Sequence, residues 1–569
     1  MQKKWILKEK ADRTIVSTLK LEIGLEQLIA EILAQRGIST FDEAKEFFRP
    51  SLENLHDPFM MKNMDKAVAR IQKAFTNKEN VLIYGDYDVD GTTAVAFTFS
   101  FFNSIYDKLD LYIPDRYSEG YGISFQGIDY AAENNVSLII ALDCGIRAID
   151  KVAYAKEKGI DFIICDHHLP GEKVPEAVAV LDPKQPGCAY PFKELSGCGI
   201  GFKLAQAFAQ AENLSDEILY DKLELVAVSI AADIVLINGE NRILAYYGLQ
   251  KLNSNPCLGI RAILGLNQIK KELSISDVVF IIGPRINAAG RIEHGRKAVE
   301  LLLSDNEESA AEIAKSVNDN NIERRGLDEQ ITKEALEIIE TNEFYQNSRS
   351  TVVFNPEWHK GVIGIVASRL IETYYKPTIV LSESDGYASG SARSVKGFDI
   401  YEAIELCSDL LEQFGGHKYA AGLKLKPENL KAFKLRFEKV VSEKIQEHHL
   451  VPIVEVDAEI NLGDITPKFI RILKRFAPFG PGNMKPVFMT RGLLDRGYAK
   501  IVGSDHLKMD VYQPDNPQLK FAAIAFGFGD FFGLVKAKKP FDICYTIEEN
   551  EWRGNITIQL NIKDIRPAD

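Results

Sequence analysis

The chain has 569 residues, of which 46% are hydrophobic and 26% charged, and its formal net charge is −13. The length predicts about three or four globular domains, and the composition is that of ordinary globular proteins. Because no apolar run reaches the roughly 20 residues of a membrane span or forms a signal peptide, we expect neither a membrane protein nor a secreted one.

The seven cysteines are scattered and include no Cys-x-x-Cys pair, which argues against a disulfide framework and against structural zinc. We therefore expect a cytoplasmic protein. The acidic net charge alone gives no support to a nucleic-acid partner, although a local basic groove is compatible with it.

Residues 1–57 are predicted to form short amphipathic helices. From residue 58 to about residue 290, short apolar runs alternate with segments of helical composition. This rhythm is typical of βαβ units and predicts an α/β fold with a doubly wound parallel sheet covered on both faces. The runs are NVLIYGD, LDLYIPD, SLIIALD, DFIICDH and AVAVLDP.

Three further segments are predicted in the second half of the chain. Residues 291–345 carry many charges and few helix breakers, which predicts one long linking helix. Residues 346–446 are predicted to form a second, smaller α/β domain. Residues 452–569 contain short strands with interleaved aromatic and basic residues, as in an OB-type barrel that stacks bases and follows phosphates; packing of the barrel core explains the aromatics equally well.

The stretch YGDYDVDG at residues 84–91 places Asp86, Asp88 and Asp90 at alternate positions. An EF-hand calcium loop opens in this way but needs a bidentate Glu at its twelfth position, where this chain has Phe97. The stretch also follows a predicted strand instead of a helix. An EF-hand is therefore excluded, and a solvated acidic turn remains as the simpler alternative.

Other predicted strands end in similar side chains. One ends at Asp143, and another ends at Asp166, His167 and His168. Because ligands of a doubly wound sheet bind beyond the carboxyl ends of its strands, these groups are expected at one edge. Asp233 adds a carboxylate within an apolar stretch predicted as helix, where an unpaired charge is costly.

Hard carboxylate oxygens with one or two imidazoles suit Mn²⁺ or Mg²⁺ better than structural zinc. The carboxylates are more numerous than one divalent ion needs. We therefore expect two metal ions, an arrangement that activates water for hydrolysis of phosphoesters.

The segments DYDVD, LDCG, DHH and IAAD, in this order, resemble the four motifs of the DHH phosphoesterases. WHKGVIGIVASRL, GSARS and FGGHKYAAGL resemble the DHH-associated domain of that family. With IPDRYSEGYGIS, GPRINAAGRI, APFGPGNMKPVF and HLKM, the set is similar to the family's 5′→3′ exonucleases specific for single-stranded DNA, which implies a role in DNA repair and recombination.

The resemblance also implies roles for single residues. Many members of the family have a histidine where this chain has Tyr84, so Tyr84 is not expected to bind metal. His168 is implied to contact the scissile phosphate, Asp166 to orient His167, and Asp86 to lie behind the ligands, although its direct contact with metal stays open. The implied ligands are Asp88, Asp90, Asp143 as the bridging group, His167 and Asp233.

Phosphate contacts are implied in the same way. Arg116, Ser391 and Arg393 are expected to bind a 5′-phosphate, and the DNA path is expected to include Arg285, Asn287 and Arg291. For each arginine, surface ion pairing is an equally good explanation. Gly415, Gly416 and His417 indicate either close approach of the substrate or a tight turn.

Two other functions stay open at this point. One is a phosphodiesterase for short oligonucleotides or cyclic dinucleotides, and the other is a non-catalytic DNA-binding scaffold. We expect a monomer whose partners are single-stranded DNA and, by resemblance, a helicase and a single-strand-binding protein, with no membrane contact.

Overall fold

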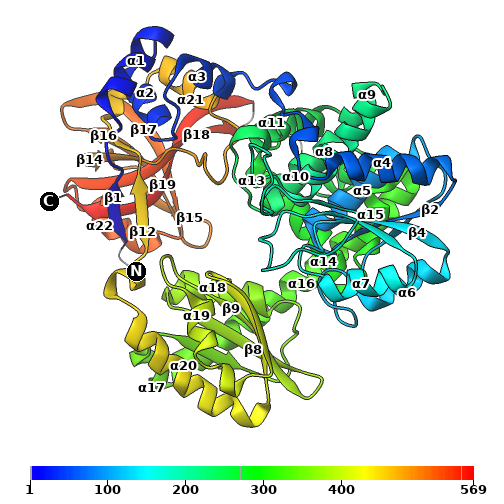
Figure 1. Cartoon of the computed structure of the whole chain (residues 1–569). Helices are drawn as coiled ribbons and strands as arrows, with labels where there is room; N and C mark the ends of the chain where they lie inside the picture. The colour runs from blue at the N-terminus through cyan, green and yellow to red at the C-terminus, as the bar shows by residue number, and fades with distance from the viewer. Residues whose placement is uncertain (1–2, 270, 553, 569) are drawn as a thin grey trace. The chain divides into compact units, whose positions relative to one another are not determined.

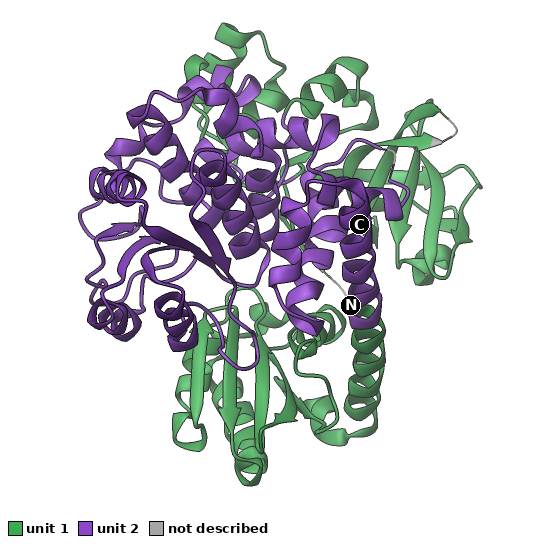
Figure 2. Cartoon of the chain, turned by 90° about the vertical axis from the view of Figure 1, so that its right-hand side faces the viewer, with its two compact units in different colours: residues 1–44, 325–475, 485–569 green, residues 45–324, 476–484 purple. Residues whose placement is uncertain are grey.

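The computed structural model describes residues 3–269, 271–552 and 554–568. The chain folds into two compact units, which are coloured separately in Figure 2. One unit contains residues 45–324 and 476–484, and the other contains residues 1–44, 325–475 and 485–569. Within the described ranges, no helix has both the length and the apolar character needed to cross a membrane.

The first unit is built on a five-stranded sheet in which every neighbouring pair is parallel, with strand order β3-β2-β4-β5-β6. The predicted doubly wound parallel sheet is thus confirmed. Its strands are β2 (Asn80–Gly85), β3 (Leu109–Tyr112), β4 (Val136–Leu142), β5 (Asp161–Cys165) and β6 (Ala179–Leu181).

Both faces of this sheet are buried because alternate side chains of each strand enter different cores. Ile83 and Ile140 pack with α4, α5 and α8, whereas Leu82 and Ile139 pack with α6 and α7, below the sheet in Figure 1. These helices are α4 (Met64–Thr76), α5 (Val89–Asn103), α6 (Phe125–Glu133), α7 (Ile149–Glu157) and α8 (Gly197–Ala211).

A helical layer completes this unit. It contains α10 (Leu223–Ala232), α11 (Gly239–Ser254), α12 (Leu258–Leu266), α13 (Ile275–Asp277), a π-helical turn (Val278–Ile282), α14 (Gly283–Ile292) and α15 (Arg296–Leu303). The long helix α16 spans Glu307–Thr341, shorter than the predicted 291–345. It starts late because Asn306 accepts a hydrogen bond from the Ser309 amide and so caps a new helix after α15.

The N-terminal segment differs from the predicted run of helices. It contains α1 (Arg13–Ile23), α2 (Gln27–Ala34) and α3 (Phe41–Phe48), but it opens with strand β1 (Lys4–Leu7). This strand pairs in parallel with β12 (Ile453–Val456), and Trp5 Nε1 donates to Asp564 over 2.6 Å. A pairing partner so distant in sequence leaves no local signal.

The second unit contains the predicted smaller α/β domain. Its mixed sheet has the strand order β10-β11-β9-β8-β7, and only β7 and β8 are parallel. The main elements are β7 (Thr351–Phe354), α18 (Ile363–Tyr374), β8 (Thr378–Ser384), β9 (Tyr387–Arg393), α19 (Ile400–Glu405), β10 (Gln413–His417), β11 (Ala420–Leu425) and α20 (Leu430–Lys444).

The C-terminal region is a seven-stranded sheet with the order β13-β14-β18-β19-β17-β16-β15. Because β14 also pairs with β16, the strands between them close into a barrel, as predicted. The elements are β13 (Ala458–Glu459), α21 (Pro467–Lys474), β14 (Phe488–Asp495), β15 (Lys500–Val502), β16 (His506–Gln513), β17 (Asn516–Phe526), α22 (Phe532–Lys536), β18 (Phe541–Trp552) and β19 (Asn555–Pro567).

Residues 476–484 follow α21 in sequence but belong to the unit of the parallel sheet. The buried Arg242 of α11 donates to the carbonyls of Phe476, Ala477 and Pro478, at 3.0, 3.0 and 3.3 Å. The Ile237 amide donates to the Pro481 carbonyl at 2.7 Å. This loop therefore fills part of the unit's own interior.

The same unit contains a buried ion pair between helices. Lys203 of α8 and Glu240 of α11 are 0% and 1% exposed, with Nζ 3.1 Å from the carboxylate. The His56 amide and the Tyr190 hydroxyl also donate to Glu240, and Lys203 donates to the His56 carbonyl. Burial lowers the pKa of Lys203, so the charged pair depends on both partners.

We expect Glu240→Ala to destabilise this unit by about 3–5 kcal/mol, because it leaves the buried Lys203 ammonium without its counter-charge. Native-state hydrogen exchange of α8 and α11 amides measures the change. The matched control is Glu300→Ala, since Glu300 pairs with Arg296 at 3.1 Å but is 47% exposed. It should cost about 0.5 kcal/mol or less; equal effects of the two variants would contradict the expectation.

Candidate metal centre

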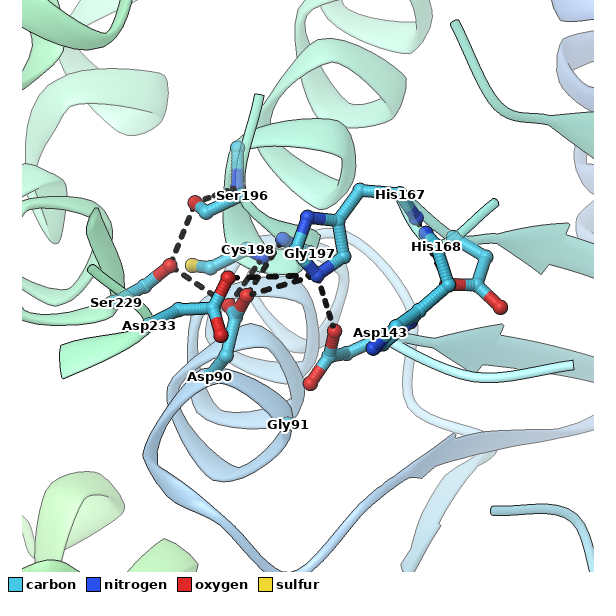
Figure 3. Close-up of polar contacts among 12 residues, drawn as sticks. Asp90, Gly91, Asp143, His167, His168, Ser196, Gly197, Cys198, Ser229 and Asp233 are labelled. Carbon is cyan, nitrogen blue, oxygen red and sulfur yellow. Dashed lines mark hydrogen bonds and ion pairs between the residues drawn. The ribbon is translucent and has the colours of Figure 1, made fainter. Parts of the chain in front are cut away.

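Asp90 lies in the first turn of α5 and is fixed by the start of α8. Its two carboxylate oxygens accept hydrogen bonds from the amides of Gly197 and Cys198, at 2.7 and 2.8 Å. The Ser229 hydroxyl of α10 donates to the same carboxylate at 2.7 Å (Figure 3). The positive end of a helix thus stabilises the carboxylate and sets its direction.

Asp143 follows β4 in a left-handed backbone conformation, with φ of 59°. Its amide donates to the Cys165 carbonyl at 2.8 Å, which holds it beside the end of β5. Aspartate tolerates this conformation better than most residues. Gly197 is required opposite it, because a Cβ there would lie 2.5 Å from Asp143 Cβ.

His167 lies at the centre of the site, after the end of β5 (Figure 3). Its Nε2 atom is 3.2 Å from Asp143 Oδ1, 3.5 Å from Asp233 Oδ2 and 3.8 Å from Asp90 Oδ2. Two overlapping sets of side chains offer ligand atoms within 4.8 Å of one another: Asp90, His167 and Asp233, and Asp143, His167 and His168.

Asp233 lies at the C-terminal end of α10 and not inside an apolar helix as predicted. Its side chain is 32% exposed, so it faces the site without being fully removed from water. The chain turns directly after it, since Ile234 has φ of 59°, a rare value for a β-branched residue. This turn ends the helix where the carboxylate reaches His167.

Asp166 organises the DHH tripeptide. Its Oδ1 accepts hydrogen bonds from the amides of His167 and His168 and lies 2.7 Å from His168 Nδ1. The Ile146 amide donates to its other oxygen at 2.8 Å. Burial opposes the ionisation of Asp166, but the hydrogen bonds from His168 and the backbone lower its pKa. Asp166 therefore holds the backbone of both histidines and the ring of His168.

His168 is held in its charged form by this contact. Burial lowers its pKa, but the hydrogen bond and the charge of Asp166 outweigh burial and raise the pKa to about 9. Its free edge faces Tyr121, whose hydroxyl lies 3.5 Å from His168 Nε2. The half-exposed Tyr121 lies within the motif IPDRYSEGYGIS, but its contact with His168 was not predicted from the sequence.

Asp86 and Asp88 differ in their surroundings. Asp86 is 0% exposed, and its Oδ1 accepts the Tyr87 amide at 2.7 Å. Asp88 caps α5, since its Oδ1 accepts the Gly91 amide at 3.0 Å. Neither falls into the two sets of close ligand atoms. The buried Tyr84 hydroxyl donates to the Gly122 carbonyl at 3.0 Å, away from these sets.

The carboxylates of the site disfavour one another's charge. Burial, followed by the charges of neighbouring aspartates, raises the pKa of Asp143 well above its usual range and the pKa of Asp233 to about 8. Burial and neighbouring carboxylates likewise raise the pKa of Asp86 and Asp88. Bound cations would oppose these shifts and favour the ionised form of all four carboxyl groups.

The donor atoms fit divalent cations. Asp143 Oδ1 and His167 Nε2 are buried and have no hydrogen-bond partner among the described residues. Burial lowers the pKa of His167, which favours the neutral imidazole that a metal needs. Carboxylate oxygens with one imidazole suit Mn²⁺ or Mg²⁺.

Cations gather beside the aspartate motif. The guanidinium of Arg116 lies 4.8 Å from the Tyr87 ring centroid. Burial, together with the neighbouring Arg116 and Arg324, lowers the pKa of Arg291 to about 10. Groups with pKa values shifted by burial and by neighbouring charges are candidates for a functional site. Arg324 lies in α16, whose many charges gave no reason in the sequence to single it out.

The other predicted DNA contacts on α14 differ from one another. Asn287 is partly exposed, as a contact residue requires. Arg285 instead donates to Asn318 at 3.0 Å, to the Ile281 carbonyl at 2.6 Å and to Asn267. Its guanidinium therefore joins helices of its own unit.

The remaining predicted residues lie in the smaller α/β domain. Arg393 Nη1 donates to the Ser391 hydroxyl at 3.1 Å, and both lie on β9. A Cβ at Gly364 would lie 3.0 Å from Ser391 Oγ, so this pair faces the first turn of α18. His417 is exposed at the end of β10, next to a tight hairpin in which a Cβ at Gly416 would lie 2.4 Å from the Ala420 carbonyl oxygen.

Three family models match separate parts of the chain. Residues 80–230 match the DHH family N-terminal domain, residues 347–443 match the DHHA1 domain, and residues 456–564 match the RecJ OB domain.

Curated relatives and a solved structure resemble nearly the whole chain. The single-stranded-DNA-specific exonuclease RecJ of Bacillus subtilis is 36% identical over 98% of the chain and 70% of the relative. Its counterpart in Escherichia coli is 31% identical over 98% of each. The crystal structure of RecJ with Mn²⁺ from Thermus thermophilus superimposes with a TM-score of 0.85 at 25% identity, over 100% of this chain and 80% of the other.

We expect Gly197→Ala to displace Asp143, because the added methyl would lie 2.5 Å from Asp143 Cβ and 2.6 Å from its Oδ1. Calorimetric titration with Mn²⁺ should show affinity reduced by about tenfold or more. Gly199→Ala is the matched control two residues along, since its nearest contact would be 3.3 Å. Unchanged Mn²⁺ affinity in the Gly197 variant would refute the expected displacement.

We expect His168 in the metal-free protein to titrate near pH 9, against an ordinary value of about 6.5. Because the folded pKa lies above the unfolded one, the stabilisation from this pair is complete below about pH 6.5 and is lost as the pH rises through about 9. NMR titration measures the pKa, and Asp166→Asn should lower it. An unaltered pKa in that variant would contradict the role of Asp166.

Proposed function

Since the chain belongs to the RecJ family of single-stranded-DNA-specific exonucleases, we propose that it hydrolyses phosphodiester bonds of single-stranded DNA from a 5′ end. The observation that carries this proposal is the cluster at the carboxyl edge of the parallel sheet. There, His167 Nε2 lies within 3.8 Å of three separate carboxylates, those of Asp90, Asp143 and Asp233.

We assign metal binding to Asp88, Asp90, Asp143, His167 and Asp233, with Asp143 bridging. When bound, two Mn²⁺ or Mg²⁺ ions supply an activated water and charge compensation at phosphorus. The protein's own contribution is to hold these side chains rigidly. The α8 amides fix Asp90, and the left-handed turn with Gly197 opposite fixes Asp143.

His168 is the proposed contact to the scissile phosphate. Its charge is maintained by Asp166, and a cationic imidazole donates a hydrogen bond to a phosphate oxygen and stabilises the charge that develops there. Asp166 acts through His168 and is a positioning residue. Asp86, buried behind the cap of α5, is proposed to act in the same indirect way.

The DNA backbone is proposed to follow the cations of the sheet unit. Arg116, Arg291 and Arg324 form a group that suits phosphates, and Asn287 lies on the same helix as Arg291. In the smaller domain, Ser391, Arg393 and the first turn of α18 offer a hydroxyl, a guanidinium and backbone amides. We assign the 5′-terminal phosphate to this group, which gives the enzyme its polarity.

The C-terminal barrel is proposed to hold the strand beyond the site by stacking and phosphate contacts. A role in DNA repair and recombination, a cytoplasmic location, and a helicase and a single-strand-binding protein as partners belong to the same proposal. The seven cysteines, which all occur as free thiols, fit a reducing compartment.

We expect Mn²⁺ or Mg²⁺ to support release of nucleotides from the 5′ end of linear single-stranded DNA. Asp143→Ala should reduce the rate by at least about a thousandfold, and EDTA should abolish it. Gel analysis of 5′- and 3′-labelled strands measures polarity.

Arg393→Ala should raise the KM for 5′-phosphorylated strands much more than the KM for 5′-hydroxyl strands.

Circular single strands serve as the control, because an exonuclease finds no end on them. Cleavage of circles at the linear rate, or full activity of Asp143→Ala, would exclude the proposed reaction. Hydrolysis of dinucleotides alone would favour the small-substrate phosphodiesterase. DNA binding without any hydrolysis would favour the scaffold.

A further inference from the structure

Phe280 is a large apolar side chain with no place in the core. Its exposed fraction is 77%, the highest among the exposed aromatic residues in the described part of the chain. It lies in the middle of the π-helical turn Val278–Ile282, and both ends of this turn are completely buried. The turn therefore packs inward on either side of Phe280 and directs its ring to solvent.

This π turn is braced by neighbouring helices. Arg285 donates to the Ile281 carbonyl at 2.6 Å, within the turn itself. The same guanidinium donates to Asn318 of α16 at 3.0 Å and to Asn267 at the end of α12. A single π turn within a helix is uncommon and occurs often at functional sites. Phe280 is thus an exposed ring on a rigid support.

The helix that carries Phe280 leads to the phosphate contacts. Beyond the π turn, α14 carries Asn287 and then Arg291, which lies close to Arg116 and Arg324. Arg291 lies eleven positions after Phe280, which corresponds to about 17 Å along a helix at 1.5 Å per residue. This length equals about five nucleotides at a spacing of about 3.4 Å, and fewer in an extended strand.

We propose that Phe280 stacks on a nucleobase of the bound single strand, about three to five nucleotides from the phosphate held at Arg291. The inference rests on the proposed function and assigns one base contact within it. A base fits better than an apolar protein surface, because one exposed ring and a group of guanidiniums occur on the same continuous helical segment, as bases and phosphates occur along one DNA strand. Stacking also tolerates any sequence, as an exonuclease requires.

Steady-state kinetics on 5′-phosphorylated strands test this contact. Phe280→Ala should raise the KM for a 20-nucleotide strand by about 5- to 150-fold, with kcat changed less than about twofold. On a dinucleotide, which is too short to reach the ring, the variant should match the wild type. Phe280→Trp should keep the wild-type KM, and its added indole fluorescence should be quenched by the 20-nucleotide strand in EDTA but not by the dinucleotide.

Phe59→Ala is the matched control, since Phe59 is an exposed phenylalanine of the same unit, on the short turn Pro58–Met60. It should leave both KM values unchanged. An unchanged KM for the long strand in Phe280→Ala would overturn the proposal and leave the ring to a protein partner. Equal losses on both substrates would also overturn it, because they indicate a structural role. A wild type without activity on either DNA would instead refute the proposed function.

Discussion

Mutual repulsion of carboxylates gathered at one edge of the parallel sheet is the constraint on which this structure depends. Asp90, Asp143 and Asp233 approach one imidazole from three different elements. Burial and the neighbouring aspartates raise the pKa of Asp143 and of Asp233, so both are less stable as anions. The fold can bring them together because other groups of the protein fix the position of each carboxylate. The backbone amides of α8, the turn after β4 and the end of α10 provide that support.

This constraint explains why residues that never contact a substrate surround the site. Gly197 has no side chain because Asp143 occupies that volume. Ser229 directs Asp90. Asp166 accepts from the amides of His167 and His168, contacts the His168 ring and is itself held by the Ile146 amide. Gly197 and Ser229 add no charge to the site, and the anionic Asp166 is compensated by the charged His168 beside it.

Much of this arrangement was predictable because parallel strands deliver their last residues to one edge of a sheet. The spacing of Asp86, Asp88 and Asp90, together with Asp143 and the DHH tripeptide, indicated the correct sheet and the correct edge. Features that depend on distant partners were not predictable. Strand β1 forms by pairing with the distant β12. The end of α10 at Asp233 depends on the left-handed conformation of Ile234, which the apolar sequence around it did not indicate. The position of Arg324 beside Arg291 was not predictable either, because the sequence of its helix contains many charges.

The loop 476–484 belongs to one domain by sequence and to another by its contacts. It lies within the stretch that matches the barrel domain, yet Arg242 and Ile237 of the sheet unit bind its carbonyls. Deleting the barrel at a domain border would therefore leave Arg242 buried beside Phe47 without the carbonyls of residues 476–478. Removal of the barrel with this loop would thus remove hydrogen-bond acceptors from the interior of the sheet unit, so the loop is structurally part of both.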